Sequence, residues 1–231
     1  MRKIVVISLL AVFGVYLLEV LFKLDFGHQF FLNGVKDFYL TNSPEKLNVA
    51  NVVTSIVVNF RGFDTLGEVT VLFLATTAMS SILYKERHQL GERAVLFSSS
   101  RIVMTGSKLL FPAIILLGVY VFIHGHLTPG GGFQGGVIIA TGFLLMLLAY
   151  KDYRVSHMAL SIVESSAGII FASVGLLGML NGGTFLENFL PTGTMNNLLS
   201  GGVIPIIYIA VGLKVGAELT GLIYTALNEK D

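Results

Sequence analysis

Long apolar stretches alternate with short polar connections along the whole chain. A transmembrane helix needs about 20 predominantly apolar residues. Six stretches reach or approach that length, at residues 3–22, 65–84, 108–123, 133–150, 157–180 and 199–227. The third stretch is the shortest, and we expect its helix to extend into residues 124–127 or to cross the membrane with little tilt. The pattern therefore predicts an all-α, polytopic membrane protein with about six transmembrane helices.

The first apolar stretch follows a basic start, as the apolar region of a secretory signal peptide would. Glu19 and Lys23 come at its end, however, without a small-x-small cleavage pattern. We therefore interpret this stretch as a retained transmembrane helix.

The distribution of Lys and Arg predicts the orientation in the membrane. The connection at residues 85–108 carries five basic residues, whereas those at 124–132 and 181–198 carry none. Because positive charge is retained on the cytoplasmic side, both termini are expected in the cytoplasm, in the cell membrane of a prokaryote. The 23–61 connection carries four basic residues on the opposite side, where its length weakens the rule.

Composition excludes several classes of function. Hydrophobic residues make up 54% of the chain and charged residues 13%, against about 25% charged residues in ordinary soluble domains. A soluble enzyme is therefore excluded, and the net charge of +1 leaves no basic face for nucleic acid. Without Cys there is no disulfide, no Cys-ligated metal and no thiol catalysis. We expect no catalytic chemistry and no cofactor in this chain.

The polar connections also suggest how the chain is organised. Residues 41–45 form a predicted turn cluster, and residues 47–60 have the helical spacing of an interfacial segment. The long 85–108 connection separates two spans from four. We therefore expect two domains, at residues 1–90 and 91–231.

Two sequence motifs resemble those of a known family. Residues 60–68, FRGFDTLGE, resemble the C-terminal region of the large subunit of Mrp-type multisubunit cation/proton antiporters. The same MbhE-like module occurs as a separate small subunit in membrane-bound hydrogenase complexes. Residues 124–136, HGHLTPGGGFQGG, resemble the signature of the antiporter's MnhB protein, an MnhB-like domain. The two modules usually lie on separate polypeptides, and here they are fused.

The glycines of the second motif permit two interpretations. Residues 130–135 fit G-x-G-x-x-G, but nucleotide binding would need a preceding strand and a βαβ unit, and here a spanning helix precedes the motif. Pro129 and the glycines are instead expected to turn the chain. The pairs Gly131/Gly135 and Gly132/Gly136 have the spacing of close helix contacts. We favour such packing over a loop whose backbone lines an ion entrance.

Three ionisable residues are expected in the cytoplasmic half of the membrane. Lys214 lies near the centre of the last span, and Glu218 follows it on the same helix face. Glu164 lies roughly 10 Å deep in the fifth span. Because a charge at this depth costs about 2.5–3.5 kcal/mol, the three residues are expected to form one cluster. This cluster either takes part in ion transfer, which we favour, or forms an ion pair that holds two spans together.

A second set is expected in the outer half. Glu68 lies one turn deeper than Asp64, and we favour a proton-handling role for it. Asp64 is better explained by the helix dipole, with Arg61 to neutralise it. Glu19 is equally consistent with an interfacial carboxylate and with a role in transport.

The histidines of the second motif are a further candidate pair. Histidine side chains exchange protons with water near neutral pH, so His124 is a candidate proton relay. His124 and His126 alone make a poor zinc site, so no metal is expected. A hydrogen-bonded structural histidine is the alternative.

The resemblance implies a membrane subunit of a multisubunit antiporter module, with other membrane subunits as partners. Na⁺ or H⁺ would move between the inner cluster and the outer set of Glu19, Glu68 and His124. The alternative is a structural subunit that bridges parts of a hydrogenase-like respiratory complex. A stand-alone transporter is less favoured, because no inverted repeat is evident.

Overall fold

The computed structural model describes residues 2–23, 34–90 and 99–228 of the 231-residue chain. These residues form two compact units, Met1–Phe38 and Tyr39–Asp231. Every regular element among the described residues is helical, and six of these helices are long and apolar enough to cross a membrane. The predicted all-α fold with six spans is therefore confirmed.

The first unit contains helix α1 (Arg2–Lys23) and the beginning of helix α2 (Val35–Leu47). One of the six candidate spans, Val6–Lys23, lies in α1. Near the end of α1, Lys23 Nζ lies 2.6 Å from Glu19 Oε1, and both side chains are exposed. The charges at the end of this helix therefore pair with each other.

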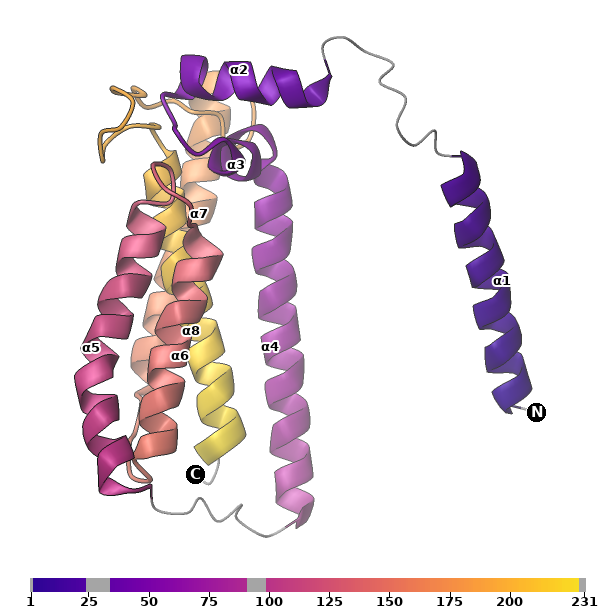
Figure 1. Cartoon of the computed structure of the whole chain (residues 1–231), viewed down its shortest axis with the longest axis vertical. Helices are drawn as coiled ribbons and strands as arrows, with labels where there is room; N and C mark the ends of the chain where they lie inside the picture. Colours follow the sequence, from indigo (N-terminus) through magenta and orange to yellow (C-terminus); the bar gives the residue numbers. More distant parts are fainter. Residues whose placement is uncertain (1, 24–33, 91–98, 229–231) are drawn as a thin grey trace. The chain divides into compact units, whose positions relative to one another are not determined.

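The second unit is built around five long helices that run side by side (Figure 1). They are α4 (Gly62–Leu90), α5 (Arg101–Ile123), α6 (Gly132–Ala149), α7 (His157–Gly182) and α8 (Ile204–Asn228). Helix α8 packs against the other four. Within its span 56% of the residues are buried, the largest share among the six. Polar side chains on α8 are therefore mostly enclosed by protein.

Glycines allow α6 and α8 to approach closely. A Cβ atom on Gly136 would lie 2.8 Å from the Gly212 carbonyl oxygen and 2.8 Å from Val215 Cβ. A Cβ atom on Gly132 would lie 2.7 Å from Val211 Cβ. Because part of this contact is backbone, a side chain fits only if one helix moves. The spacing of Gly132 and Gly136 thus belongs to a helix contact.

Several predicted helix boundaries are wrong. Helix α5 begins at Arg101 instead of residue 108, because the Ser100 hydroxyl accepts a hydrogen bond from the Val103 N–H and caps the helix. At its other end, residues 124–127 form turns and do not extend the span. Helix α8 begins at Ile204 instead of residue 199, after a turn that includes the positive-φ residue Gly201.

The predicted turn at residues 41–45 is also wrong, because these residues lie inside α2, which includes Pro44. The Ser43 hydroxyl donates to the Tyr39 carbonyl at 2.6 Å. Ser43 and Leu47 are buried. Tertiary packing therefore outweighs the local preference for a turn.

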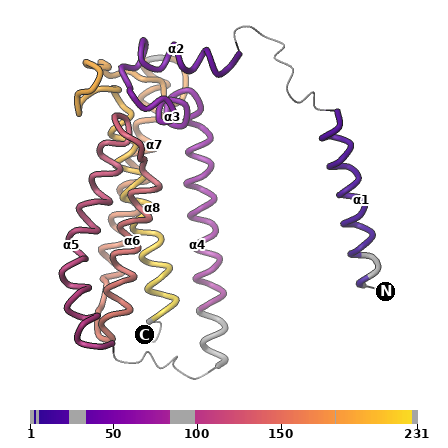
Figure 2. The backbone as a smooth tube through the Cα atoms, viewed as in Figure 1, coloured from indigo at the N-terminus to yellow at the C-terminus, as the bar shows by residue number. Residues whose placement is uncertain are grey.

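The predicted interfacial segment at residues 47–60 is present as two short elements. They are α3 (Val52–Ser55) and the π-helical turn η1 (Ile56–Phe60). The Thr65 hydroxyl on α4 donates to the Val57 carbonyl of η1 at 2.6 Å. In Figure 2, α3 lies at the end of the bundle where α4 begins.

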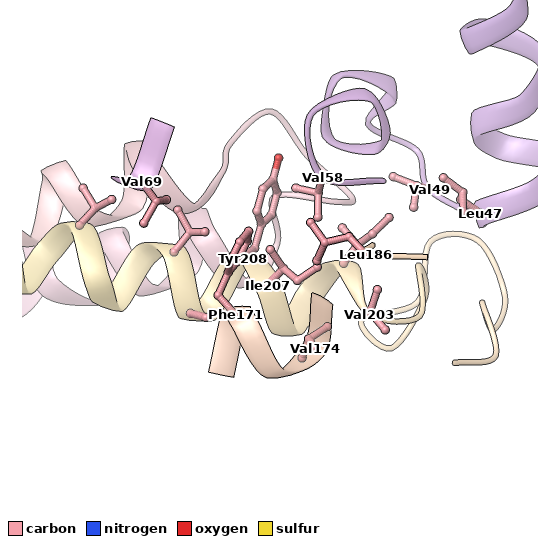
Figure 3. Packing of buried hydrophobic residues seen from close by; sticks show 14 residues of the cluster. Leu47, Val49, Val58, Val69, Phe171, Val174, Leu186, Val203, Ile207 and Tyr208 are labelled. Atoms are coloured by element: carbon pink, nitrogen blue, oxygen red, sulfur yellow. The ribbon is translucent and has the colours of Figure 1, made fainter. Parts of the chain in front are cut away.

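A buried apolar cluster connects the start of α8 with the segments around it (Figure 3). Ile204 and Ile207 on α8 are fully buried. Val49 and Val58 from the α3 region pack there, and the Tyr208 ring joins them with its hydroxyl toward α3 (Figure 3). This core anchors the beginning of α8, so that the rest of the helix is held between α4, α6 and α7.

Candidate ion-translocation site

The structure brings together the three ionisable residues that were expected in one half of the membrane. Lys214 Nζ lies 2.6 Å from Glu218 Oε1 and 3.7 Å from Glu164 Oε1. The side chains are 13% exposed for Lys214, 1% for Glu218 and 25% for Glu164. Lys214 follows Ile204 at a distance of about 15 Å along α8, near the middle of a hydrocarbon core of about 30 Å.

Local geometry explains why these side chains meet. Lys214 and Glu218 are one helical turn apart on α8, and Glu164 lies on the adjacent α7. Gly168, one turn after Glu164, leaves room for the lysine, since its Cβ would lie 4.0 Å from Lys214 Nζ. From α4, the Phe73 ring centroid lies 5.2 Å from the same nitrogen. The ammonium group is therefore held by two carboxylates and an aromatic face.

The cluster holds two carboxylates and one ammonium group. No donor forms a hydrogen bond of good geometry to either buried carboxylate oxygen of Glu218 within the described chain, although Lys214 lies close to one of them. An uncompensated negative charge in a buried site is unfavourable. A proton or a small cation would neutralise it, so the cluster is chemically suited to take up one positive charge.

A polar pocket of about 320 Å³ adjoins the cluster, between α4, α7 and α8. Both glutamates line it. Its other polar lining residues carry hydroxyl groups, apart from one histidine: Thr76, Thr77, Ser80, Ser81, Ser161, Thr225 and His157. At roughly 30 Å³ per water molecule, the pocket has room for several waters. It continues from Glu218 toward the end of α8, the end predicted to face the cytoplasm.

The residues of the predicted outer set are divided between the two units of the chain. Glu68 is exposed on α4. Arg61 Nε donates to Asp64 Oδ2 at 2.6 Å, and both side chains are exposed. Glu19 lies in the first unit, paired with Lys23.

His124, the remaining member of the outer set, follows directly after α5. Its ring stacks on Tyr120 with 4.3 Å between the centroids. Its Nδ1 lies 3.2 Å from the Tyr120 carbonyl oxygen. His124 is therefore only partly exposed and has a local structural partner.

The glycine loop packs against α8 and the neighbouring helices. A Cβ atom on Gly125 would lie 2.6 Å from the Tyr208 ring, and one on Gly135 would lie 2.6 Å from the Gly118 carbonyl oxygen. Gly131 lies near the Tyr208 hydroxyl, which would be 3.5 Å from its Cβ, and Pro129 is exposed. None of these loop residues lines the polar pocket.

Sequence reasoning missed a hydrogen-bonded network that fastens this loop. The Tyr208 hydroxyl donates to Thr54 Oγ1 at 3.0 Å, and Thr54 Oγ1 donates to the Gly125 carbonyl at 2.6 Å. The Asn51 side-chain amide donates to the carbonyls of Gly125 and Thr128. The network joins residues far apart in the sequence, so no local pattern reveals it.

His126, the other histidine of the candidate pair, is fully buried beside this network. Neither ring nitrogen has a hydrogen-bond partner among the described residues. Burial lowers the pKa of His126 below its usual value, and the nearby backbone of Asn197 and Leu198 partly opposes this effect. The neutral imidazole is therefore the form that the fold accommodates. Among the described residues, no group of three or more His, Asp or Glu side chains is arranged to hold a metal ion.

Sequence comparison identifies two family segments in the chain. The family described as "Domain related to MnhB subunit of Na+/H+ antiporter" matches residues 102–221. The MbhE family, whose description names the E component of MBH, matches residues 2–95. The first covers the cluster residues on α7 and α8, and the second covers the motif at residues 60–68.

Individual relatives agree with this assignment. An uncharacterised protein of Methanocaldococcus jannaschii is 31% identical over 94% of this chain and 90% of its own length. The B component of the Na⁺/H⁺ antiporter of Bacillus subtilis is 38% identical over 38% of this chain and 63% of its own length. The A/B component of a probable K⁺/H⁺ antiporter of Rhizobium meliloti is 28% identical over 50% of this chain, which spans only 14% of that protein.

Two solved structures have the same fold. A chain of the membrane-bound sulfane sulfur reductase, an archaeal respiratory membrane complex, is 42% identical, with a TM-score of 0.78 and 99% coverage of both chains. A chain of the Mrp complex from Dietzia sp. DQ12-45-1b is 24% identical, with a TM-score of 0.75, and covers all of this chain and 26% of that one. With its six candidate spans, this multi-pass membrane protein belongs to the family of domains related to the MnhB subunit of Na⁺/H⁺ antiporters, and an MbhE segment precedes that domain.

Proposed function

We propose that this chain is a membrane subunit of a multisubunit cation/proton antiporter module and that Glu164, Lys214 and Glu218 form part of its ion route. One observation carries the proposal: the pairing of Lys214 with two glutamates near mid-membrane, directly beside a hydroxyl-lined pocket. Ionisable residues at this depth mark ion pathways when they face a polar cavity.

The unequal distances suggest how the cluster works. Lys214 Nζ is close to Glu218 and within reach of Glu164. A proton that arrives through the pocket neutralises one carboxylate, and the ammonium group then pairs with the other. Loss of the proton restores the first pair. The lysine thus couples the charge states of the two glutamates.

The transported ion is H⁺ or Na⁺. Carboxylate and hydroxyl oxygens suit a hard cation such as Na⁺, and the same groups support a proton chain through water. In this proposal the chain has no catalytic chemistry of its own and uses no cofactor besides the transported ion. Its partners are other membrane subunits, as the names of its relatives indicate.

The proposal also includes the arrangement of the chain. Two modules, at residues 1–90 and 91–231, are supported by the family segments matched at residues 2–95 and 102–221. The distribution of Lys and Arg supports cytoplasmic termini. In that orientation the pocket opens the cluster to the cytoplasm, and Glu68 lies on the opposite side.

A second function is supported by the 42% identity to a chain of an archaeal respiratory membrane complex. In this alternative the protein bridges membrane parts of such a complex, and the charged cluster only holds α7 and α8 together. Both functions require assembly into a complex, but only the first requires ion transfer through this chain.

Ion exchange in membrane vesicles distinguishes the two functions. We expect Lys214→Ala and Glu68→Gln to leave the complex assembled and to slow Na⁺/H⁺ exchange, followed as collapse of a pH gradient on Na⁺ addition. Lys46→Ala and Glu45→Gln are matched controls, since both side chains are exposed on α2. Repeating the assay in K⁺ identifies the coupling cation.

Unchanged exchange in an assembled Lys214→Ala complex would favour the structural function. If Lys214→Ala prevents assembly, the charge-conserving Lys214→Arg decides between the functions. If ions pass through the cluster, the differently shaped guanidinium group of Lys214→Arg should slow exchange. If the ion pair is purely structural, exchange in Lys214→Arg should be normal.

A further inference from the structure

A second pocket, of about 520 Å³, lies at the end of the bundle where α5 begins and α6 ends. Its lining includes the apolar side chains of Met104, Met146 and Ala149. Lys108 and Lys151 line the same pocket. This arrangement of apolar surface and positive charge is separate from the candidate ion route, since the two pockets share no residue.

Lys108 is unusually deep for an exposed lysine. It follows Arg101, the first residue of α5, by about 10 Å along the helix axis. Helical side chains point toward the helix N-terminus, which here is the nearer membrane surface. The lysine therefore extends toward that surface while its stem lies along the apolar helix.

The Lys108 ammonium group has a defined position. It lies 5.1 Å from the centroid of the Tyr150 ring. That ring is itself fixed, because the Tyr150 hydroxyl donates to the Met104 carbonyl at 2.6 Å. The aromatic face holds the charge in place but leaves its hydrogen-bond donors free for an acceptor.

The acceptor is missing from the part of the chain that the structure describes. Neither Lys108 nor Lys151 forms an ion pair with any described carboxylate. The pocket lining contains these two cations and one acidic residue, Asp152. A net positive charge thus remains at the predicted cytoplasmic surface of the bilayer, where anionic lipid headgroups lie.

We propose that this pocket binds the phosphate of an anionic phospholipid, with Lys108 and Lys151 on the phosphate and the acyl chains against the apolar lining. A basic pocket between transmembrane helices on the cytoplasmic side is a recognised setting for anionic headgroups. A lipid matches both features of the pocket, because its charge lies at the surface and its chains lie deeper. A soluble phosphate would match only the lysines.

Photo-crosslinking in the assembled complex tests the site. The complex is reconstituted in nanodiscs that contain phosphatidylglycerol with a photoreactive acyl chain, and labelled peptides are identified by mass spectrometry. We expect labelling of the peptides that carry residues 99–108 and 146–153. Phosphatidylcholine with the same chain should label them less, and excess inorganic phosphate should not compete.

Lysine substitutions make the test specific. Each lysine near the membrane surface attracts an anionic headgroup electrostatically. The double variant Lys108→Gln with Lys151→Gln should therefore lower the labelling about tenfold. The double variant Lys108→Arg with Lys151→Arg keeps both charges and should preserve the labelling. Lys46→Gln, on α2, is the control. Equal labelling by both lipids, or unchanged labelling in the Gln variant, would overturn the proposal.

The remaining outcomes are also decisive. Lipid labelling that falls only on another protein of the complex, and not on the peptides of this pocket, would show that the lipid binds elsewhere and would overturn the proposal. Competition by inorganic phosphate would do the same in favour of a soluble anion. If the Gln variant does not assemble, the comparison of the two lipids on the unmodified complex decides alone.

Discussion

Helix α8 carries two groups of buried polar residues that are held in different ways. Near its start, the Tyr208 hydroxyl belongs to a chain of neutral hydrogen bonds through Thr54 to the Gly125 carbonyl. About 9 Å further along the helix, Lys214 is paired with two carboxylates beside a polar pocket. In the first arrangement the polar groups are hydrogen-bonded to one another, and these bonds hold separate segments of the chain together. The second retains charge next to space for water, which is what an ion route requires.

The largest expected effect comes from disrupting the close contact between α6 and α8, the helix that carries both groups. Gly136→Val places a side chain against the α8 backbone, where even a Cβ atom would lie 2.8 Å from the Gly212 carbonyl oxygen. Overpacking of this kind costs about 3 kcal/mol. We expect loss of most of the assembled complex in size-exclusion chromatography. Gly106→Val is the control, since no atom outside its own stretch of helix backbone lies within 4 Å of the position that its Cβ would take, and equal yields of the two variants would contradict this packing.

The next effect separates the two groups on α8. Glu218→Gln keeps the shape of the side chain but removes the charge that faces Lys214 at 2.6 Å. Because the variant no longer gains and loses a proton there, we expect Na⁺/H⁺ exchange in vesicles to fall about tenfold or more, with normal assembly. Glu164→Gln, at the longer distance of 3.7 Å, should have a smaller effect. Exchange within error of the Glu45→Gln control would rule out a role for Glu218.

Tyr208→Phe tests the neutral hydrogen-bonded network, for which we expect a change in stability and none in ion exchange. Loss of its hydroxyl removes one buried hydrogen bond, which is worth about 1 kcal/mol. We expect a lower midpoint of thermal unfolding for the purified complex and an unchanged exchange rate. Tyr16→Phe, at an exposed position of α1, should change neither quantity. A large loss of exchange in Tyr208→Phe would place this network on the ion route.

The smallest effect is a pH dependence of stability at His126. Burial lowers the pKa of His126 in the folded protein, so below about pH 6.5 the unfolded chain binds more protons than the folded one. Its contribution to stability is therefore complete above that pH and is lost as pH falls toward the lowered pKa. His126→Phe should flatten the pH dependence of thermal unfolding in this range. An identical slope in both proteins would show that the group does not titrate there.

Much of this molecule follows from local sequence pattern. The six spans depend on apolar length, which each segment carries in itself. The pairing of Lys214 with Glu218 follows from helical periodicity, and the depth of Glu164 follows from the helix rise. These features need no knowledge of how distant segments pack.

Other features depend on contacts between distant residues. The start of α5 is set by the Ser100 cap, and the helical conformation around Pro44 accompanies burial of Ser43 and Leu47. The network of Thr54, Gly125 and Tyr208 joins three separate regions of the chain. The pocket likewise requires three helices to converge, and no single motif indicates such a cavity.

The central claim is that water reaches the charged cluster through the pocket, and thiol accessibility tests it most directly. The chain has no cysteine, so Thr76→Cys introduces a single thiol in the pocket lining, and Leu116→Cys on the exposed surface of α5 is the lipid-facing control. A membrane-impermeant thiol reagent reacts with the thiolate, which forms in water and not in lipid. In assembled complexes we predict rapid labelling of Thr76→Cys from the cytoplasmic side and none of Leu116→Cys. Absence of labelling at Thr76→Cys from both sides, in a complex that still exchanges ions, would contradict the account.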